Sequence, residues 1–204
     1  MARGRATRRP QDSFGKRAQK EGYPARSVYK LEEIDRRIKL LRRGMRVLDL
    51  GACPGSWTLY AARQVGREGR VLGLDLNPAR TALPPQARFE ERDVTTVTTD
   101  ELGGPQSFDV VLSDMAPSTS GQAHRDQYLS FELYVRALEI ARGVLVPGGN
   151  FVGKIFQGAE FPDARKATQQ AFDKVRIIKP EASRNESYEV FLIGLGLSTE
   201  ADES

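Results

Sequence analysis

The sequence of 204 residues contains one cysteine, Cys53, and one histidine, His124. A single cysteine cannot close an internal disulfide, and one cysteine with one histidine cannot supply the four ligands of an ordinary structural zinc site. No apolar run approaches the roughly 20 residues of a membrane-spanning helix. The basic start, Met1–Arg5, is not followed by the apolar segment of a secretory signal. We therefore expect a cytoplasmic protein that uses no metal and has no membrane partner.

Positive charge is concentrated near the amino terminus. Residues 1–43 hold 14 Lys or Arg against 5 Asp or Glu, a net charge of +9, whereas the remaining residues hold 17 against 22, a net charge of −5. Such a segment suits a polyanion, because each phosphate that is neutralised releases a counterion. Phe14, Tyr23 and Tyr29 are interleaved with the basic residues, which favours nucleic acid over a merely solvated tail. This pattern does not distinguish RNA from DNA.

Strand and helix patterns alternate along the rest of the chain. Hydrophobic spacing predicts strands at 46–50, 71–75, 88–90, 108–113, 151–156, 175–178 and 188–195, and helices at 25–41, 56–65, 127–145 and 163–174. This alternation indicates an α/β fold, a mainly parallel sheet with helices on both faces. About nine residues separate the last two strands, too few for a helical crossover, so we expect an antiparallel pair.

The same patterns divide the chain into three parts. Residues 1–24 are assigned to a basic, flexible arm, and residues 25–197 to a single folded domain. The short acidic segment 198–204 is assigned to a disordered tail.

Charged side chains interrupt the apolar strand patterns. Lys154 lies within the strand at 151–156, Glu189 is the only charge in the last strand, and Asp114 follows the strand at 108–113. Burying an ion costs several kcal/mol or so unless it is paired, so these residues are candidates for a functional cluster. Lys30 flanks the apolar stripe of the first predicted helix and can reach what that helix covers. Alternatively, Lys154 lies near the strand end and extends to solvent, as most strand lysines do.

The first predicted strand leads into a glycine-containing turn, the place where a doubly wound sheet binds its ligand. Gly51 and Gly55 let the backbone pass close to a ligand, and a helix follows at once. A dinucleotide-binding turn would offer free N–H groups to a pyrophosphate. Here Pro54 removes a donor and Asp49 would repel phosphate. We therefore disfavour a nicotinamide-linked oxidoreductase and predict a nucleoside ligand with a cationic tail, such as S-adenosylmethionine.

Further carboxylates follow successive strands. Asp75 ends the second predicted strand, 24 residues after Gly51, where it can accept hydrogen bonds from ribose hydroxyls. Asp93 follows the third strand, where an adenine edge would lie, and Asp114 follows the next. Carboxylates in this order suit an ammonium and a sulfonium, although single aspartates at such positions are often helix caps or turn formers. Trp57 is equally compatible with a place in the core.

Several motifs resemble one known family, the FtsJ (RrmJ, RlmE) ribosomal RNA 2′-O-methyltransferases. The resemblance covers about residues 13–196. It rests on Asp49–Trp57 (DLGACPGSW), Ser113–Pro117 (SDMAP), Gly153–Gly158 (GKIFQG), Ser187–Val190 (SYEV) and Arg26–Leu31 (RSVYKL).

The resemblance implies the family's fold, a Rossmann-like methyltransferase with a mostly parallel seven-stranded sheet and an antiparallel final strand. It also implies a catalytic tetrad, which by position is Lys30, Asp114, Lys154 and Glu189. Lys154 would act on the acceptor hydroxyl. The methyl donor, S-adenosylmethionine, would be held by residues of the turn and the strand ends: Asp49, Gly51, Pro54, Gly55, Trp57, Asp75, Asp93 and Asp114.

The implied acceptor is a uridine ribose in large-subunit (23S) ribosomal RNA, methylated on an assembled or nearly assembled subunit by a monomeric enzyme. Residues 1–24 would then bind RNA. Two alternatives stay open, a transfer RNA 2′-O-methyltransferase and a non-catalytic RNA-binding assembly factor. A base methyltransferase is disfavoured, because the Asp114 motif lacks an aromatic residue that would stack on a flipped base.

Overall fold

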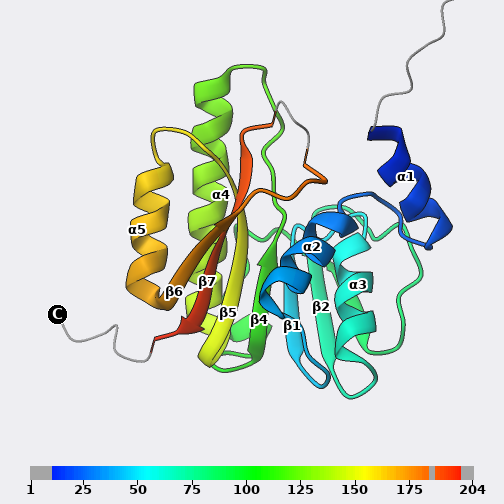
Figure 1. Cartoon of the computed structure of the whole chain (residues 1–204). Helices are drawn as coiled ribbons and strands as arrows, with labels where there is room; N and C mark the ends of the chain where they lie inside the picture. The colour runs from blue at the N-terminus through cyan, green and yellow to red at the C-terminus, as the bar shows by residue number, and fades with distance from the viewer. Residues whose placement is uncertain (1–10, 184–186, 199–204) are drawn as a thin grey trace, which may run out of the picture.

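A computed structural model describes residues 11–183 and 187–198 of the chain. Residues 1–10 of the predicted arm and residues 199–204 of the predicted tail lie outside the described part. The described residues form one sheet of seven strands (Figure 1). The strands are β1 (Arg46–Leu50), β2 (Arg70–Asp75), β3 (Ala87–Glu91), β4 (Phe108–Ser113), β5 (Leu145–Phe156), β6 (Phe172–Ile178) and β7 (Glu189–Leu197).

The strand order is β3-β2-β1-β4-β5-β7-β6, and most neighbours are parallel. The parallel pairs are β1 with β2, β1 with β4, β2 with β3 and β4 with β5, whereas β7 runs antiparallel to both β5 and β6. This confirms the predicted mainly parallel sheet and its antiparallel last strand. The carboxyl ends of β1, β2, β3, β4 and β5 therefore meet at one edge of the sheet.

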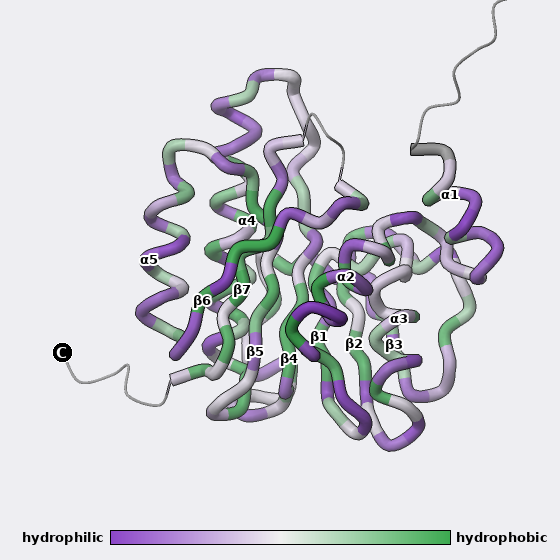
Figure 2. The backbone as a smooth tube through the Cα atoms, viewed as in Figure 1, coloured by the Kyte–Doolittle hydropathy of each residue, from purple (hydrophilic) through white to green (hydrophobic). Residues whose placement is uncertain are grey.

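Helices cover both faces of the sheet, and each face has its own apolar core. The helices are α1 (Gln11–Lys20), α2 (Val28–Ile38), α3 (Ser56–Val65), α4 (Ala123–Val144) and α5 (Phe161–Ala171). Helices α4 and α5 pack on one face, and α2 and α3 on the other (Figure 1). Hydrophobic residues are concentrated along the central strands, between the two helical layers (Figure 2). Among the described helices, none has the length and apolarity needed to cross a membrane.

The first helix of the domain is shorter than the pattern at 25–41 predicts. Helix α2 ends at Ile38, because Lys39 adopts a left-handed conformation with φ of 54°. Asp35 stabilises the turn that follows: its carboxylate accepts hydrogen bonds from the Leu41 amide and the Tyr60 hydroxyl, both at 2.9 Å. Leu41 is therefore buried beyond the helix rather than within it.

Part of the predicted arm is helical and packs against the domain. Ala18 of α1 is 1% exposed, and the ring of Phe14 lies 5.6 Å from that of Tyr29. The Arg17 guanidinium lies over the same tyrosine ring, 4.3 Å from its centre. These contacts fasten α1 to α2, so residues 11–20 pack against the rest of the described structure.

One carboxylate is fully buried beneath this fold. Asp49 of β1 faces α3 and is 0% exposed, and its Oδ2 accepts a hydrogen bond of 2.7 Å from the Thr58 hydroxyl. Burial raises the pKa of Asp49 from 3.8 to about 7, against the opposing effect of the Thr58 hydrogen bond. The folded state therefore keeps a proton that the unfolded chain loses near pH 4, and stability falls as the pH rises from about 4 to about 7.

We expect Asp49→Asn to remove this pH dependence. The free energy of unfolding of the variant should gain on that of the wild type by about 2 kcal/mol between pH 5 and pH 8, because asparagine does not titrate. Urea unfolding at several pH values measures the difference. Asp163→Asn, at an exposed position of α5, is the matched control. Parallel curves for Asp49→Asn and the wild type would show that Asp49 is ionised throughout this range.

Candidate active site

A pocket of about 450 Å³ opens at the carboxyl ends of the parallel strands. Gly51, Asp75, Asp93 and Asp114 all line it, so the structure brings together four of the residues predicted to bind a nucleoside ligand. Asp75 is the last residue of β2, and Gly51, Asp93 and Asp114 follow β1, β3 and β4. Adjacent parallel strands place all four at the same edge of the sheet.

The turn after β1 needs glycine at its first position. Gly51 has φ of +74°, and a Cβ atom there would lie 2.6 Å from Cγ of Met115. Met115 itself lines the pocket, so this close approach sets the shape of the pocket wall. Pro54 and Gly55 complete the turn and lead into α3; the Pro54 carbonyl accepts a hydrogen bond of 2.9 Å from the Arg80 amide.

Asp75 and Asp93 organise the backbone around the pocket. The Asp75 carboxylate accepts hydrogen bonds from the Cys53 amide at 3.0 Å and the Asn77 amide at 2.9 Å, which ties the loops after β1 and β2 together. The Asp93 carboxylate accepts hydrogen bonds from the Thr95 hydroxyl and amide, which hold its pKa below the usual value. Both side chains are therefore fixed in position at the pocket.

Two of the residues predicted to contact the donor are buried in the core. Asp49 is the buried partner of Thr58, and Trp57 is only 3% exposed. The Trp57 indole donates a hydrogen bond of 2.8 Å to the Ser27 carbonyl, and its ring lies 5.6 Å from that of Phe191. Asp49 and Trp57 flank the turn after β1 and pack in the core next to it. The structure thus shows Trp57 in the core position that the sequence allowed.

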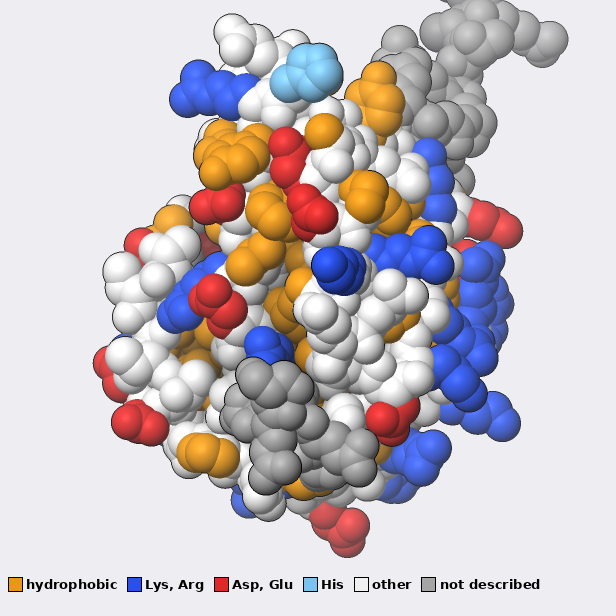
Figure 3. All heavy atoms as spheres, turned by 90° about the vertical axis from the view of Figure 1, so that its left-hand side faces the viewer, with side chains coloured by type: hydrophobic (Ala, Val, Ile, Leu, Met, Phe, Trp, Pro, Cys, Tyr) orange, Lys and Arg blue, Asp and Glu red, His pale blue; other side chains and the backbone are white. Residues whose placement is uncertain are grey.

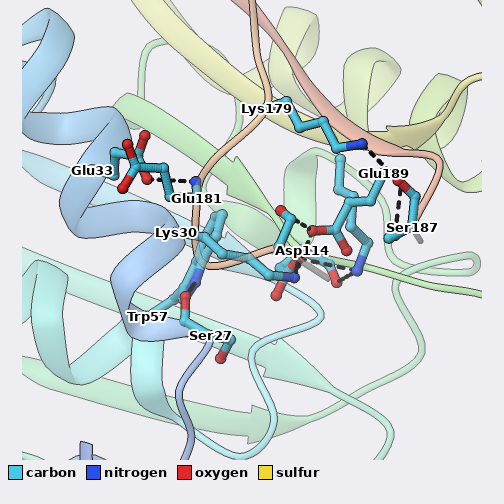
Figure 4. A network of polar contacts seen from close by, with 11 residues as sticks. Ser27, Lys30, Glu33, Trp57, Asp114, Lys179, Glu181, Ser187 and Glu189 are labelled. Carbon is cyan, nitrogen blue, oxygen red and sulfur yellow. Dashed lines mark hydrogen bonds and ion pairs between the residues drawn. The ribbon is translucent and has the colours of Figure 1, made fainter. Parts of the chain in front are cut away.

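A network of four charged side chains adjoins the pocket (Figure 4). Lys154 Nζ lies 3.0 Å from Asp114 Oδ1, and Lys30 Nζ lies 2.8 Å from Glu189 Oε1. Lys30 Nζ also lies 3.8 Å from Asp114 Oδ1, so the carboxylate of Asp114 joins the two lysines. Lys154 in addition donates a hydrogen bond to the Asp114 carbonyl. The predicted tetrad is thus one connected cluster.

Strand pairing and helix packing bring these charges together. In the antiparallel pair of β5 and β7, Glu189 is opposite Phe156, two residues beyond Lys154. Lys30 reaches the cluster from α2 (Figure 4). Lys154 is only 6% exposed and its ammonium turns inward to Asp114, so the alternative of a lysine that extends to solvent is wrong.

Serines of the segment before β7 also contact the network. Ser187 belongs to the SYEV motif, but neither it nor Ser183 was predicted to contact the network. The Ser183 hydroxyl donates a hydrogen bond of 2.8 Å to Glu189 Oε1, and Ser183 is 8% exposed. The Ser187 hydroxyl accepts a hydrogen bond of 3.2 Å from the Glu189 amide. Serines in a loop between strands carry no periodic signal, so only the three-dimensional arrangement shows that they hold Glu189 in place.

The pocket fits a nucleoside that carries a cationic tail. Asp114 Oδ1 is buried and has no well-aligned hydrogen-bond donor, only the two neighbouring ammonium groups. Carboxylates from three strand ends face the pocket, and they can accept hydrogen bonds from hydroxyl and ammonium groups but would repel a phosphate. Among the described residues, no group of three or more His, Cys, Asp or Glu is placed to hold a metal ion.

The lone cysteine near the pocket is not activated as a nucleophile. Burial raises the pKa of the Cys53 thiol, and the charge of Asp75 adds to this effect. A thiol is nucleophilic only as its thiolate. The lysines and carboxylates are therefore the candidates for the chemistry of the site.

Comparison with known proteins identifies the family. The profile described as FtsJ-like methyltransferase matches residues 23–197. Ribosomal RNA large subunit methyltransferase E of Sorangium cellulosum is 52% identical over 90% of this chain and 87% of the relative, and the protein of the same name from Nitratidesulfovibrio vulgaris (strain DSM 19637 / Miyazaki F) is 47% identical over 91% and 94%.

A solved structure supports the fold independently. The crystal structure of a Plasmodium falciparum protein described as a ribosomal RNA methyltransferase covers 86% of this chain and 98% of its own, with a TM-score of 0.73 and 22% sequence identity. At this identity the likeness shows the fold alone. The profile match and the close relatives show more: the chain belongs to the FtsJ-like methyltransferase family.

Proposed function

We propose that this protein transfers the methyl group of S-adenosylmethionine to the ribose 2′-hydroxyl of a uridine in large-subunit (23S) ribosomal RNA. The observation that carries the proposal is the connected Lys30–Asp114–Lys154–Glu189 network beside a carboxylate-lined pocket. The names of the relatives support ribosomal RNA as the acceptor. We propose that the enzyme acts as a cytoplasmic monomer on the assembled or nearly assembled subunit.

The residues of the large pocket suit the methyl donor. S-adenosylmethionine would supply an electrophilic methyl group on a sulfonium when bound. Asp75, Asp93 and Asp114 all line this pocket. In the proposal Asp75 accepts hydrogen bonds from the ribose hydroxyls, Asp93 faces the adenine edge, and Asp114 offers negative charge to the cationic end. Gly51 allows the backbone to approach the ligand. Pro54 and Gly55 shape the turn, whereas Asp49 and Trp57 act from the core by holding it.

The charged network suits work on a hydroxyl acceptor. A ribose 2′-hydroxyl is a weak nucleophile, and alignment alone can supply about 7 kcal/mol or more of the barrier. In the proposed mechanism Lys154 Nζ orients the hydroxyl or takes its proton. Asp114 and Glu189 each hold a lysine by an ion pair, and Lys30 joins the two carboxylates. The paired charges fix the position of Lys154 Nζ relative to the pocket.

Basic residues beyond the site supply a surface for the RNA backbone. Those at the end of α2 and in the turn that follows are all exposed: Arg36, Arg37, Lys39, Arg42 and Arg43. Lysine and arginine side chains gather along one side of the molecule in Figure 3. We propose that residues 1–24 add to this surface, with Lys16 and Lys20 of α1 exposed. Binding to such a surface weakens steeply with salt.

We expect Lys154→Ala to abolish methyl transfer and to leave the dissociation constant of S-adenosylmethionine within about twofold, because Lys154 is not among the residues that line the large pocket. Single-turnover rates and calorimetric titration measure the two effects. Lys166→Ala, an exposed lysine of α5, is the control and should retain full activity. Loss of donor binding together with turnover would count against the assignment of Lys154 to the acceptor.

Gly51→Ala should raise the dissociation constant of S-adenosylmethionine at least about tenfold, because its Cβ would displace Met115 into the pocket. Gly44→Ala is a matched control: Gly44 has a similar φ of +81°, but no atom lies within 4 Å of its added Cβ. Both variants carry the same kind of backbone strain. Equal donor affinities in the two variants would place the donor away from this turn.

The acceptor is tested by transfer of labelled methyl to undermethylated large ribosomal subunits and, in parallel, to unmodified transfer RNA. We expect label in subunit RNA that disappears with Lys154→Ala. Label only in transfer RNA would make the protein a transfer RNA 2′-O-methyltransferase. Label in neither acceptor would favour a non-catalytic RNA-binding assembly factor.

A further inference from the structure

A second, smaller pocket of about 260 Å³ lies between the start of α4 and the adjoining ends of β5 and β7. Its walls include Phe156 of β5, Tyr188 next to β7, and Gln127 of α4. None of these side chains belongs to the charged network or to the donor pocket as described above. Its volume is below the range typical of whole drug-sized ligands, so it suits one ring system.

The second pocket begins where the charged network ends. Phe156 lies two residues beyond Lys154 on β5, and Tyr188 directly precedes Glu189. The loop after β4 separates the two pockets: Ser118 lines the large pocket and Thr119 the small one. The large pocket, the charged network and the small pocket therefore follow one another along the edge of the sheet, from β2 toward β7.

The walls of the small pocket favour an uncharged aromatic ligand. Tyr188 is 62% exposed, although large aromatic side chains are usually covered, and Phe156 adds a second ring. Asp126 also lines the pocket, and its negative charge disfavours a phosphate. Nucleobases are flat and uncharged, and proteins that read single-stranded RNA commonly stack them on exposed aromatic rings.

The pocket wall is held in place before any ligand binds. The Asp126 carboxylate accepts hydrogen bonds of 2.8 Å from both the amide and the hydroxyl of Ser120, and one of 3.3 Å from the Gly121 amide. These hydrogen bonds lower the pKa of Asp126, so the loop stays fastened at neutral pH. A fixed wall reduces the entropy lost when a ligand is ordered there.

We propose that this small pocket holds the base of the acceptor nucleotide, stacked on Tyr188, while its ribose lies at Lys154. The inference rests on the proposed function and adds a specificity-determining residue to it. The donor and the acceptor base would then occupy opposite sides of the charged network. Tyr188 touches the acceptor and takes no part in the transfer itself.

Kinetics of tyrosine variants test the stacking. Tyr188→Ala should lower kcat/KM for undermethylated large ribosomal subunits about tenfold, the loss expected when one stacked base loses its aromatic partner, and leave the dissociation constant of S-adenosylmethionine unchanged. Tyr188→Phe keeps the ring and should stay within about twofold of the wild type. Tyr128→Ala removes another exposed tyrosine, 50% exposed on α4, and should also match the wild type.

Photo-crosslinking identifies the ligand. The amino acid p-benzoylphenylalanine replaces Tyr188, or Tyr128 as the control, and reverse transcription maps the crosslinked nucleotide in the large subunit. We expect a crosslink from position 188 at the methylated nucleotide and none there from position 128.

Two results would overturn the inference. One is a Tyr188→Ala enzyme as active as the wild type, and the other is a crosslink from position 188 at a different nucleotide. A wild-type enzyme that labels no large-subunit RNA would instead overturn the proposed function itself, so the two failures are distinguishable.

Discussion

The pairing of four charges, two buried and two partly buried, at one edge of the sheet is the constraint on which the site depends. Lys154 and Glu189 are 6% and 8% exposed, and each would cost several kcal/mol or so if it were left unpaired. Two cations and two carboxylates balance, so the cluster is tolerated only as a set. Removal of one member leaves another uncompensated. This coupling explains why the four side chains come from four different elements that meet at one place.

The fold supplies that meeting point through two features. The antiparallel strand β7 lies beside β5, which brings Glu189 next to the end of the Lys154 strand. Helix α2 packs on the face of the sheet that α3 also covers, and it carries Lys30 into the cluster. The Lys30 ammonium also lies 5.9 Å from the centre of the Phe191 ring. The Trp57 indole fastens α3 to the segment before α2 through the Ser27 carbonyl. These core residues therefore position the charges.

The sequence patterns predicted much of this arrangement. The boundaries of β1, α3 and β4 agree with the predicted 46–50, 56–65 and 108–113, because turn residues flank compact apolar runs there. Strand β5 is longer than predicted, because it begins at Leu145, ahead of the Pro147–Gly149 segment that the pattern placed before the strand. The register of its pairing with β4 shifts near the start of β4. The alternation of apolar and polar residues that predicts a regular strand therefore does not identify this first part of β5.

The sequence revealed the charged cluster for a physical reason, whereas it did not reveal the contacts of Asp49 and Ser183. Lys154 and Glu189 contradict the apolar pattern of their strands, and such contradictions mark functional positions. Asp49 also interrupts an apolar strand, but its partner is Thr58 in the core. The period-two rule places Asp49 on the same face of the sheet as Val47, whereas only the packing of α3 reveals the hydroxyl that meets its carboxylate. Ser183 belongs to no periodic pattern in the sequence.

We propose that the four charges act as one unit on the acceptor hydroxyl. The most direct measurement is a double-mutant cycle on the single-turnover rate of methyl transfer, with Lys30→Ala, Glu189→Gln and the combined variant. When two residues work as a unit, loss of the second adds little once the first is lost, so we expect the double variant to be about as slow as the slower single variant. Rate losses that multiply would show that Lys30 and Glu189 act independently and that the four charges do not form a unit.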